Sequence, residues 1–173
     1  MKGLIERFSK RADCKVLPPI FCERLDKTID CDLPNELIEF YNLCGGIEIS
    51  PESASDDAII LPQEEFKQAD PIIANEEMIE IWKEAGIYDS FKSKDCFVFV
   101  DIGNGNYIVV DLNKEHFQNV YLANWENYPN LGDVPVLANS ISEFLNLLIL
   151  GLENSNDFFW EAYDFTPIKM AFN

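Results

Sequence analysis

The sequence is poor in the residues that most often bind metals or act as nucleophiles. It has a single histidine, His116, and five widely spaced cysteines with no C-x-x-C pair. Structural zinc sites usually take paired ligands two to four residues apart, and disulfide-rich scaffolds use even cysteine counts at higher density. We therefore expect free thiols in a reducing compartment, with no metal and no cofactor.

Long apolar runs are also missing. The stretch FLNLLILGL at 144–152 falls short of the roughly 18 to 20 residues that a membrane span needs. The first fifteen residues mix charged with apolar side chains and lack the continuous apolar core of a secretory signal. With 173 residues, 47% of them apolar, the chain can bury one core. We expect a soluble, cytoplasmic, single-domain protein that does not bind a membrane.

Basic residues are scarce. Thirteen Lys and Arg stand against 31 Asp and Glu, a net charge of −18. The first 27 residues hold seven basic and four acidic residues, so the remainder of the chain carries −21. Such a surface disfavours direct binding to nucleic acid and attracts basic partners. Composition alone leaves open the alternative that the acidity only keeps the protein soluble.

Hydrophobic periodicity predicts both helices and strands. In the segment 33–44, Pro34 suits the first turn of a helix. Gly45-Gly46, directly after it, can adopt the left-handed conformation that ends a helix. Asn75 is placed to cap the next helix, and Ser140 with Glu143 has capping-box spacing. The expected helices are 3–12, a segment after Pro18-Pro19, 34–44, 76–85 and 141–152, and the expected strands are 58–61, 96–102, 107–112 and 119–123.

The stretch DIGNGN at 101–106 separates two apolar runs and raises the question of a ligand-binding loop. Asn104-Gly105 is typical of a type I′ hairpin turn, which needs positive φ at both central positions. A phosphate loop would lead into a helix, whereas a strand follows here. A calcium loop would need a bidentate glutamate where Leu112 stands. We interpret DIGNGN as the corner of a hairpin.

The sequence carries no enzyme signature. Cys96 and His116 are a conceivable nucleophile and base, but Cys96 lies in an expected buried strand and nothing places His116 beside it. Adjacent carboxylates are expected by chance in so acidic a chain. An unrecognised hydrolase would need a concave site with perturbed carboxylates. We therefore expect a protein without catalytic residues.

Several segments taken in order carry a family resemblance. These are LPNELIEFYNLCGGIEI, an acidic variable region, FVFVDIGNGNYIVVDL, NVYLANWEN and LANSISEFLNLLI. Together they resemble the SUKH superfamily, the family of the fungal Smi/Knr cell-wall-assembly regulators and of many bacterial toxin-immunity proteins. The resemblance covers 29–152 and divides the chain into an N-terminal helical extension (1–28), a SUKH-like domain (29–152) and an aromatic C-terminal segment (153–173). It implies an α+β fold, a mostly antiparallel sheet flanked by helices.

The resemblance also implies a function: a non-enzymatic immunity protein that binds and neutralises a cognate toxin domain. The charge of the main body favours a basic, nucleic-acid-targeting toxin. The alternative is a regulatory scaffold that binds endogenous cytoplasmic proteins, and both a monomer and a homodimer stay open. Trp125 and Tyr128 are either aromatic anchors for the partner or loop residues that pack over the sheet edge. The expected partner-binding residues are Asp56, Asp57, Glu64, Glu65, Glu76, Glu77, Glu80, Trp125 and Tyr128.

Overall fold

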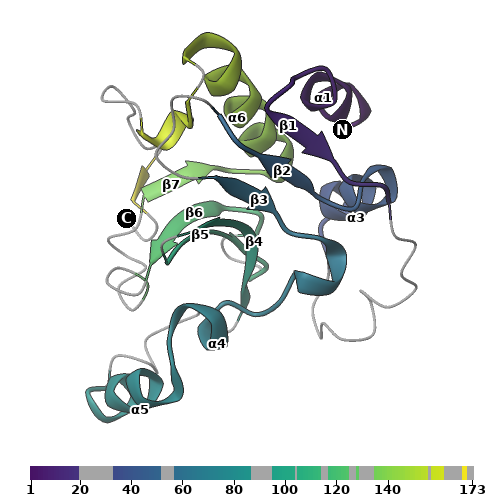
Figure 1. Ribbon diagram of the computed structural model, residues 1–173. Helices are drawn as coiled ribbons and strands as arrows, with labels where there is room; N and C mark the ends of the chain where they lie inside the picture. Colours follow the sequence, from purple (N-terminus) through teal and green to yellow (C-terminus); the bar gives the residue numbers. More distant parts are fainter. Residues whose placement is uncertain are drawn as a thin grey trace.

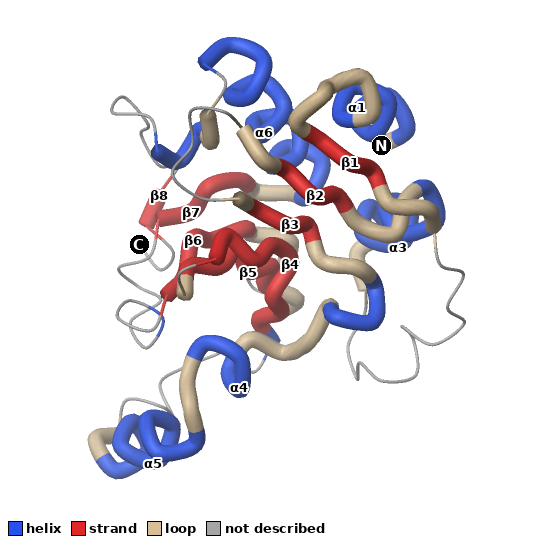
Figure 2. The backbone as a smooth tube through the Cα atoms, in the orientation of Figure 1, coloured by secondary structure: helices blue, strands red, loops and turns tan. Residues whose placement is uncertain are grey.

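The protein is built around one antiparallel sheet. A computed structural model describes residues 1–19, 33–51, 57–86, 95–103, 105–113, 117–124, 128, 135–155, 157–161 and 169–170. Within these residues eight strands pair in the order in which they occur in the chain, and helices lie on both faces (Figures 1 and 2). The expected α+β fold is therefore confirmed. The strands are β1 (Cys14–Val16), β2 (Ile47–Ile49), β3 (Ala58–Ile60), β4 (Cys96–Gly103), β5 (Asn106–Asp111), β6 (Val120–Asn124), β7 (Pro135–Ala138) and β8 (Lys169–Met170).

The stretch DIGNGN forms the corner of the β4–β5 hairpin. Gly103 pairs with Asn106 across a two-residue connection, and Gly103 and Gly105 have φ values of 80° and 85°. The Asp101 carboxylate accepts a hydrogen bond from the Gly103 N–H at 2.8 Å. The chain turns from strand to strand, so the hairpin prediction is confirmed. The turn type predicted at Asn104 lies outside the described residues.

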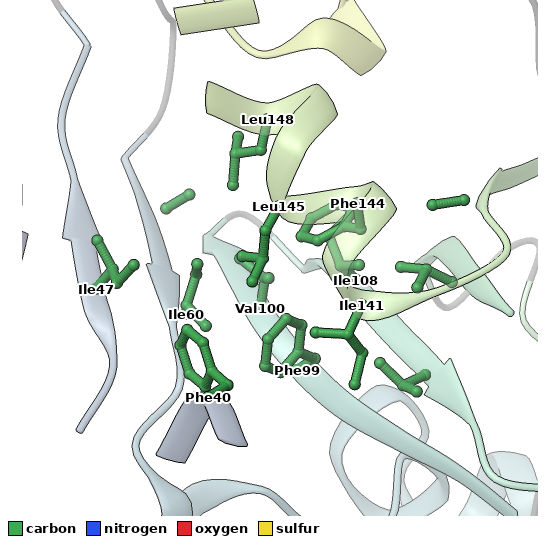
Figure 3. Close-up of a cluster of buried hydrophobic side chains, with 14 of the residues drawn as sticks. Phe40, Ile47, Ile60, Phe99, Val100, Ile108, Ile141, Phe144, Leu145 and Leu148 are labelled. Carbon is green, nitrogen blue, oxygen red and sulfur yellow. The ribbon is translucent and has the colours of Figure 1, made fainter. Parts of the chain in front are cut away.

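Three helices cover one face of the sheet: α1 (Lys2–Phe8), α3 (Asn35–Leu43) and α6 (Ile141–Ser155). Alternation along each strand sends every second side chain into this layer, as with Ile108 and Val110 on β5. Figure 3 shows the core between α6 and the sheet. Its labelled members are Phe40, Ile47, Ile60, Phe99, Val100, Ile108, Ile141, Phe144, Leu145 and Leu148.

The predicted ends of two helices need correction. Helix α1 ends at Phe8, so Ala12 is exposed and does not share its buried side. Helix α3 ends because Cys44 is extended, with φ −152°, rather than through a left-handed residue. Gly46, two residues later, has φ 127° and belongs to the turn into β2. The helix predicted after Pro18-Pro19 lies largely outside the described residues, since 20–32 are not described.

Helix α6 begins as its sequence predicts. The Glu143 N–H donates to Ser140 Oγ at 3.1 Å. The Glu143 carboxylate reaches back to the Asn139 N–H at 2.8 Å, one residue before the donor of a standard capping box. The predicted cap is confirmed. The two hydrogen bonds join the first turn of the helix to the residues directly before it.

The N-terminal helix and the segment directly after α6 both pack against α6. The Arg7 guanidinium of α1 donates to Glu153 at 2.6 Å and to Asn146 at 3.1 Å. After α6, Phe158 is buried and its ring stacks on Trp160 with the centroids 4.7 Å apart. The first aromatic residues of the C-terminal segment therefore belong to the helical side of the fold.

The opposite face of the sheet carries the segment that follows β3. The chain passes from β3 through η1 (Gln63–Glu65) and α4 (Asp70–Ile73) to α5 (Glu76–Glu84), which lies away from the sheet at the lower left of Figure 1. A second buried cluster lies under α4, with Cys96, Val98 and Val109 from the sheet. No helix among the described residues is long and apolar enough to cross a membrane.

Candidate protein-binding surface

Most of the predicted acidic residues lie along one segment of the molecule. Asp57 is exposed just before β3, and the two glutamates of η1 and the three predicted on α5 are exposed as well. Asp56 lies outside the described residues. The segment 57–86 contains eight acidic and two basic residues, a net charge of −6. We call this segment the acidic arm.

The exposed glutamates of helix α5 form the outer surface of the acidic arm. The Asn75 side chain accepts a hydrogen bond from the Met78 N–H at 2.8 Å, which caps the helix as predicted. No residue of α5 is fully buried, although Trp82 packs in part against the second cluster. Helical spacing of the apolar residues Met78, Ile81, Trp82 and Ala85 predicts an inward side chain for Ile81, but this side chain is 55% exposed. It lies one turn from Glu77 and Glu84, so an apolar side chain interrupts the acidic surface.

The acidic residues differ in whether a basic group neutralises them. Close ion pairs join Arg7 to Glu153 at 2.6 Å, Arg11 to Asp13 at 2.6 Å and Lys15 to Glu48 at 2.9 Å. The hydrogen bond from Arg11 lowers the pKa of Asp13, and the hydrogen bond from Arg7 lowers that of Glu153.

The basic partners in these pairs all come from the first fifteen residues. The glutamates of η1 and α5 take part in no ion pair among the described residues. Two of these pairs lie near α1 and α6, and the third, Lys15 with Glu48, joins β1 to β2. Among the described residues, none of these bases pairs with the glutamates of η1 and α5.

The two predicted aromatic anchors have different outcomes. Trp125 lies outside the described residues. Tyr128 is only 1% exposed, and its hydroxyl donates to the buried Asp70 carboxylate at 2.5 Å. Its ring is part of the second cluster, where it removes apolar side chains of β5 and β6 from water. Tyr128 is therefore a loop residue that packs over the sheet and not an exposed anchor for a partner.

The considered catalytic pair has no support in the geometry. Cys96 is fully buried, and burial, with the charge of Asp111 second, raises the pKa of its thiol well above the ordinary value. A thiol held protonated in this way is a poor nucleophile. His116 lies outside the described residues. No group of three or more metal-ligating side chains is found in the part of the chain that the structure describes.

Strand pairing creates a second surface that sequence patterns did not reveal. Glu48 pairs with Ile59, Ile59 with Asp101, and Asp101 with Tyr107. All four side chains are partly exposed, and Ile59 and Tyr107 pack against the second cluster, on the face opposite α1, α3 and α6. We call these four residues the open row. The available signal was Asp101 at the start of DIGNGN and Tyr107 directly after it.

Comparisons with known proteins agree with the resemblance described above. The sequence profile of the SMI1 / KNR4 family (SUKH-1) matches residues 22–147. A curated relative, "Immunity protein YokJ" of Bacillus subtilis (strain 168), is 25% identical over 171 residues, which cover 98% of this chain and 94% of the relative. No solved structure matches the chain.

Proposed function

The chain belongs to the SMI1 / KNR4 family (SUKH-1), and we propose that it is an immunity protein that binds a cognate toxin domain and blocks it. The similarity to an immunity protein over nearly the whole chain supports this role. The protein acts by occupying a surface of the toxin and has no catalytic step of its own. It acts in the cytoplasm of the cell that makes the toxin.

The toxin is a basic enzyme that acts on nucleic acid. The observation that carries this part is the set of exposed glutamates on η1 and α5 with no ion-pair partner among the described residues. An enzyme that binds phosphates needs a basic surface. The carboxylates of the acidic arm match such a surface in charge and compete with the phosphates for it.

Co-expression with the product of the neighbouring upstream reading frame tests the proposal, with growth rescue and affinity capture as the two readouts. We expect rescue and a stoichiometric complex. The double variant Glu77→Gln, Glu80→Gln should lower the association rate by about threefold to tenfold. The matched control, Glu6→Gln with Glu39→Gln, removes the same charge from the side that carries α1 and α3.

Two results would contradict the proposal. A neighbour that is not toxic and is not captured would point to the regulatory scaffold instead, with partners among the cell's own proteins. Equal association rates for the two double variants would show that the acidic arm does not meet the toxin.

A further inference from the structure

The open row combines charge, aromatic surface and partial exposure in a fixed arrangement. Glu48, Ile59, Asp101 and Tyr107 come from four neighbouring strands and are paired directly. Directly opposed side chains of an antiparallel pair have Cβ atoms about 5 Å apart. The rigid sheet thus holds the Asp101 carboxylate beside the Tyr107 ring.

Hydrogen-bonding groups in the row are available for a ligand. One oxygen of Asp101 accepts from the Gly103 N–H. The other oxygen and the Tyr107 hydroxyl have no hydrogen bond among the described residues. Glu48 is engaged by Lys15 at 2.9 Å. Burial and the charge of Asp101 raise the pKa of Tyr107, so the ring stays neutral at physiological pH. A neutral ring beside an ionised carboxylate suits a cation with a flat, weakly hydrated surface.

Within the part of the chain that the structure describes, no helix packs over the open row. Helices α1, α3 and α6 pack on the other face, and α4 packs over the end of this face where Cys96 and Val98 lie. Asp57 directly precedes β3, two residues before Ile59. It is exposed and adds negative charge beside the row. A partner that docks here therefore meets carboxylates around a small apolar centre.

We propose that the open row binds an arginine side chain of the basic toxin, with the guanidinium stacked on Tyr107 and paired with Asp101. This inference rests on the proposed function for the identity of the partner. Arginine fits better than lysine because its planar guanidinium can stack on a ring and meet a carboxylate at the same time, whereas the ammonium is a strongly hydrated point charge. The row thereby adds selectivity to the long-range attraction of the acidic arm.

The test uses the full ¹⁵N-labelled chain and two peptides of equal charge, octa-arginine and octa-lysine, followed by NMR. Octa-arginine should shift the amides of Ile59, Asp101 and Tyr107 and should bind about three to five times more tightly than octa-lysine. Asp101→Asn and Tyr107→Leu should each remove most of that preference. Leucine keeps the apolar packing of Tyr107 and removes the aromatic face together with the hydroxyl, so the fold is retained.

The control is Glu6→Gln, which removes one charge from α1 and should leave the preference unchanged. Equal affinity for the two peptides, or shifts confined to α5, would overturn the assignment of the open row. Because the titration needs no toxin, it separates the two proposals. Absence of a captured toxin contradicts the immunity role alone, and absence of an arginine preference contradicts the open row alone.

Discussion

At the scale of single residues, Gly46 shows why a position can admit only glycine. Its φ of 127° is rarely adopted by other residues, and an added Cβ would lie 2.6 Å from the Ile60 carbonyl oxygen. Its own carbonyl accepts from the Leu17 N–H at 2.9 Å. The turn at Gly46 therefore contacts both the end of β1 and the end of β3.

Gly46→Ala should lower the free energy of unfolding by about 3 kcal/mol, since the backbone is strained and the contact with Ile60 is a clash with main chain. Urea unfolding followed by tryptophan fluorescence measures the loss. Gly3→Ala is the control, because a Cβ at this position of α1 meets nothing within 4 Å. It should leave stability unchanged or raise it by up to about 1 kcal/mol. Similar midpoints for both variants would contradict the prediction.

The described thiols make stability fall at alkaline pH. Burial raises the pKa of Cys14 from its ordinary 9.0 to about 12 and that of Cys44 to about 11. Above pH 9 the unfolded chain loses these protons while the folded protein keeps them, so the unfolded state gains relative stability. The urea midpoint should therefore decrease between pH 8 and pH 11, and less steeply in Cys44→Ala. A midpoint that stays constant or rises over this range would refute the assignment.

At the scale of elements, the number of residues in a helix or strand largely decided whether its hydrophobic periodicity could be recognised in the sequence. Helices α5 and α6 and strands β4 to β6 contain enough residues for a period to show. Strands β1 and β2 have three residues each, too few for alternation, and form because Val16 pairs with Ile47 far along the chain. Strand β3 is as short and was predicted from the unbroken apolar run AIIL at 58–61.

The same reasoning applies to the candidate surfaces. The periodicity of α5 correctly predicted its exposed glutamates. A loop residue such as Tyr128 has no period to follow, and the open row exists only through the pairing of β2 to β5.

The cap of α6 tests an element that was predicted from sequence. Ser140→Ala removes the oxygen that accepts from the Glu143 N–H and should cost about 1 kcal/mol of stability. Ser142→Ala, two residues later inside the helix, is the control and should change stability by less than about 0.5 kcal/mol. Thermal unfolding of the two variants gives the comparison. An equal effect of both would mean that the hydroxyl of Ser140 does not stabilise the first turn.

At the scale of the whole molecule, charge is separated into two regions. Four basic residues of the first fifteen positions, Lys2, Arg7, Arg11 and Lys15, pair with acidic residues of α1, α6, the segment before β1, and β2. The acidic arm, on the side of the sheet away from these helices, keeps its net charge of −6. The molecule therefore presents a directed electrostatic field, which orients a basic partner before contact.

Association with the toxin should slow at least tenfold between about 50 and 500 mM salt, while dissociation changes little, because screening acts on the encounter more than on the bound complex. Stopped-flow measurements of the two rates would show this. The variant Glu77→Gln, Glu80→Gln should have a shallower salt dependence than wild type. An association rate that does not respond to salt would refute electrostatic steering.

The order of the strands has a consequence for synthesis of the chain. Each strand pairs with the one before it, so the sheet can grow in the order in which the ribosome delivers it. The part of the apolar face that α6 covers stays exposed until α6 has been synthesised, and Arg7 in the first helix has its partner Glu153 only then. Under the proposed function, protection begins only once nearly the whole chain has been translated.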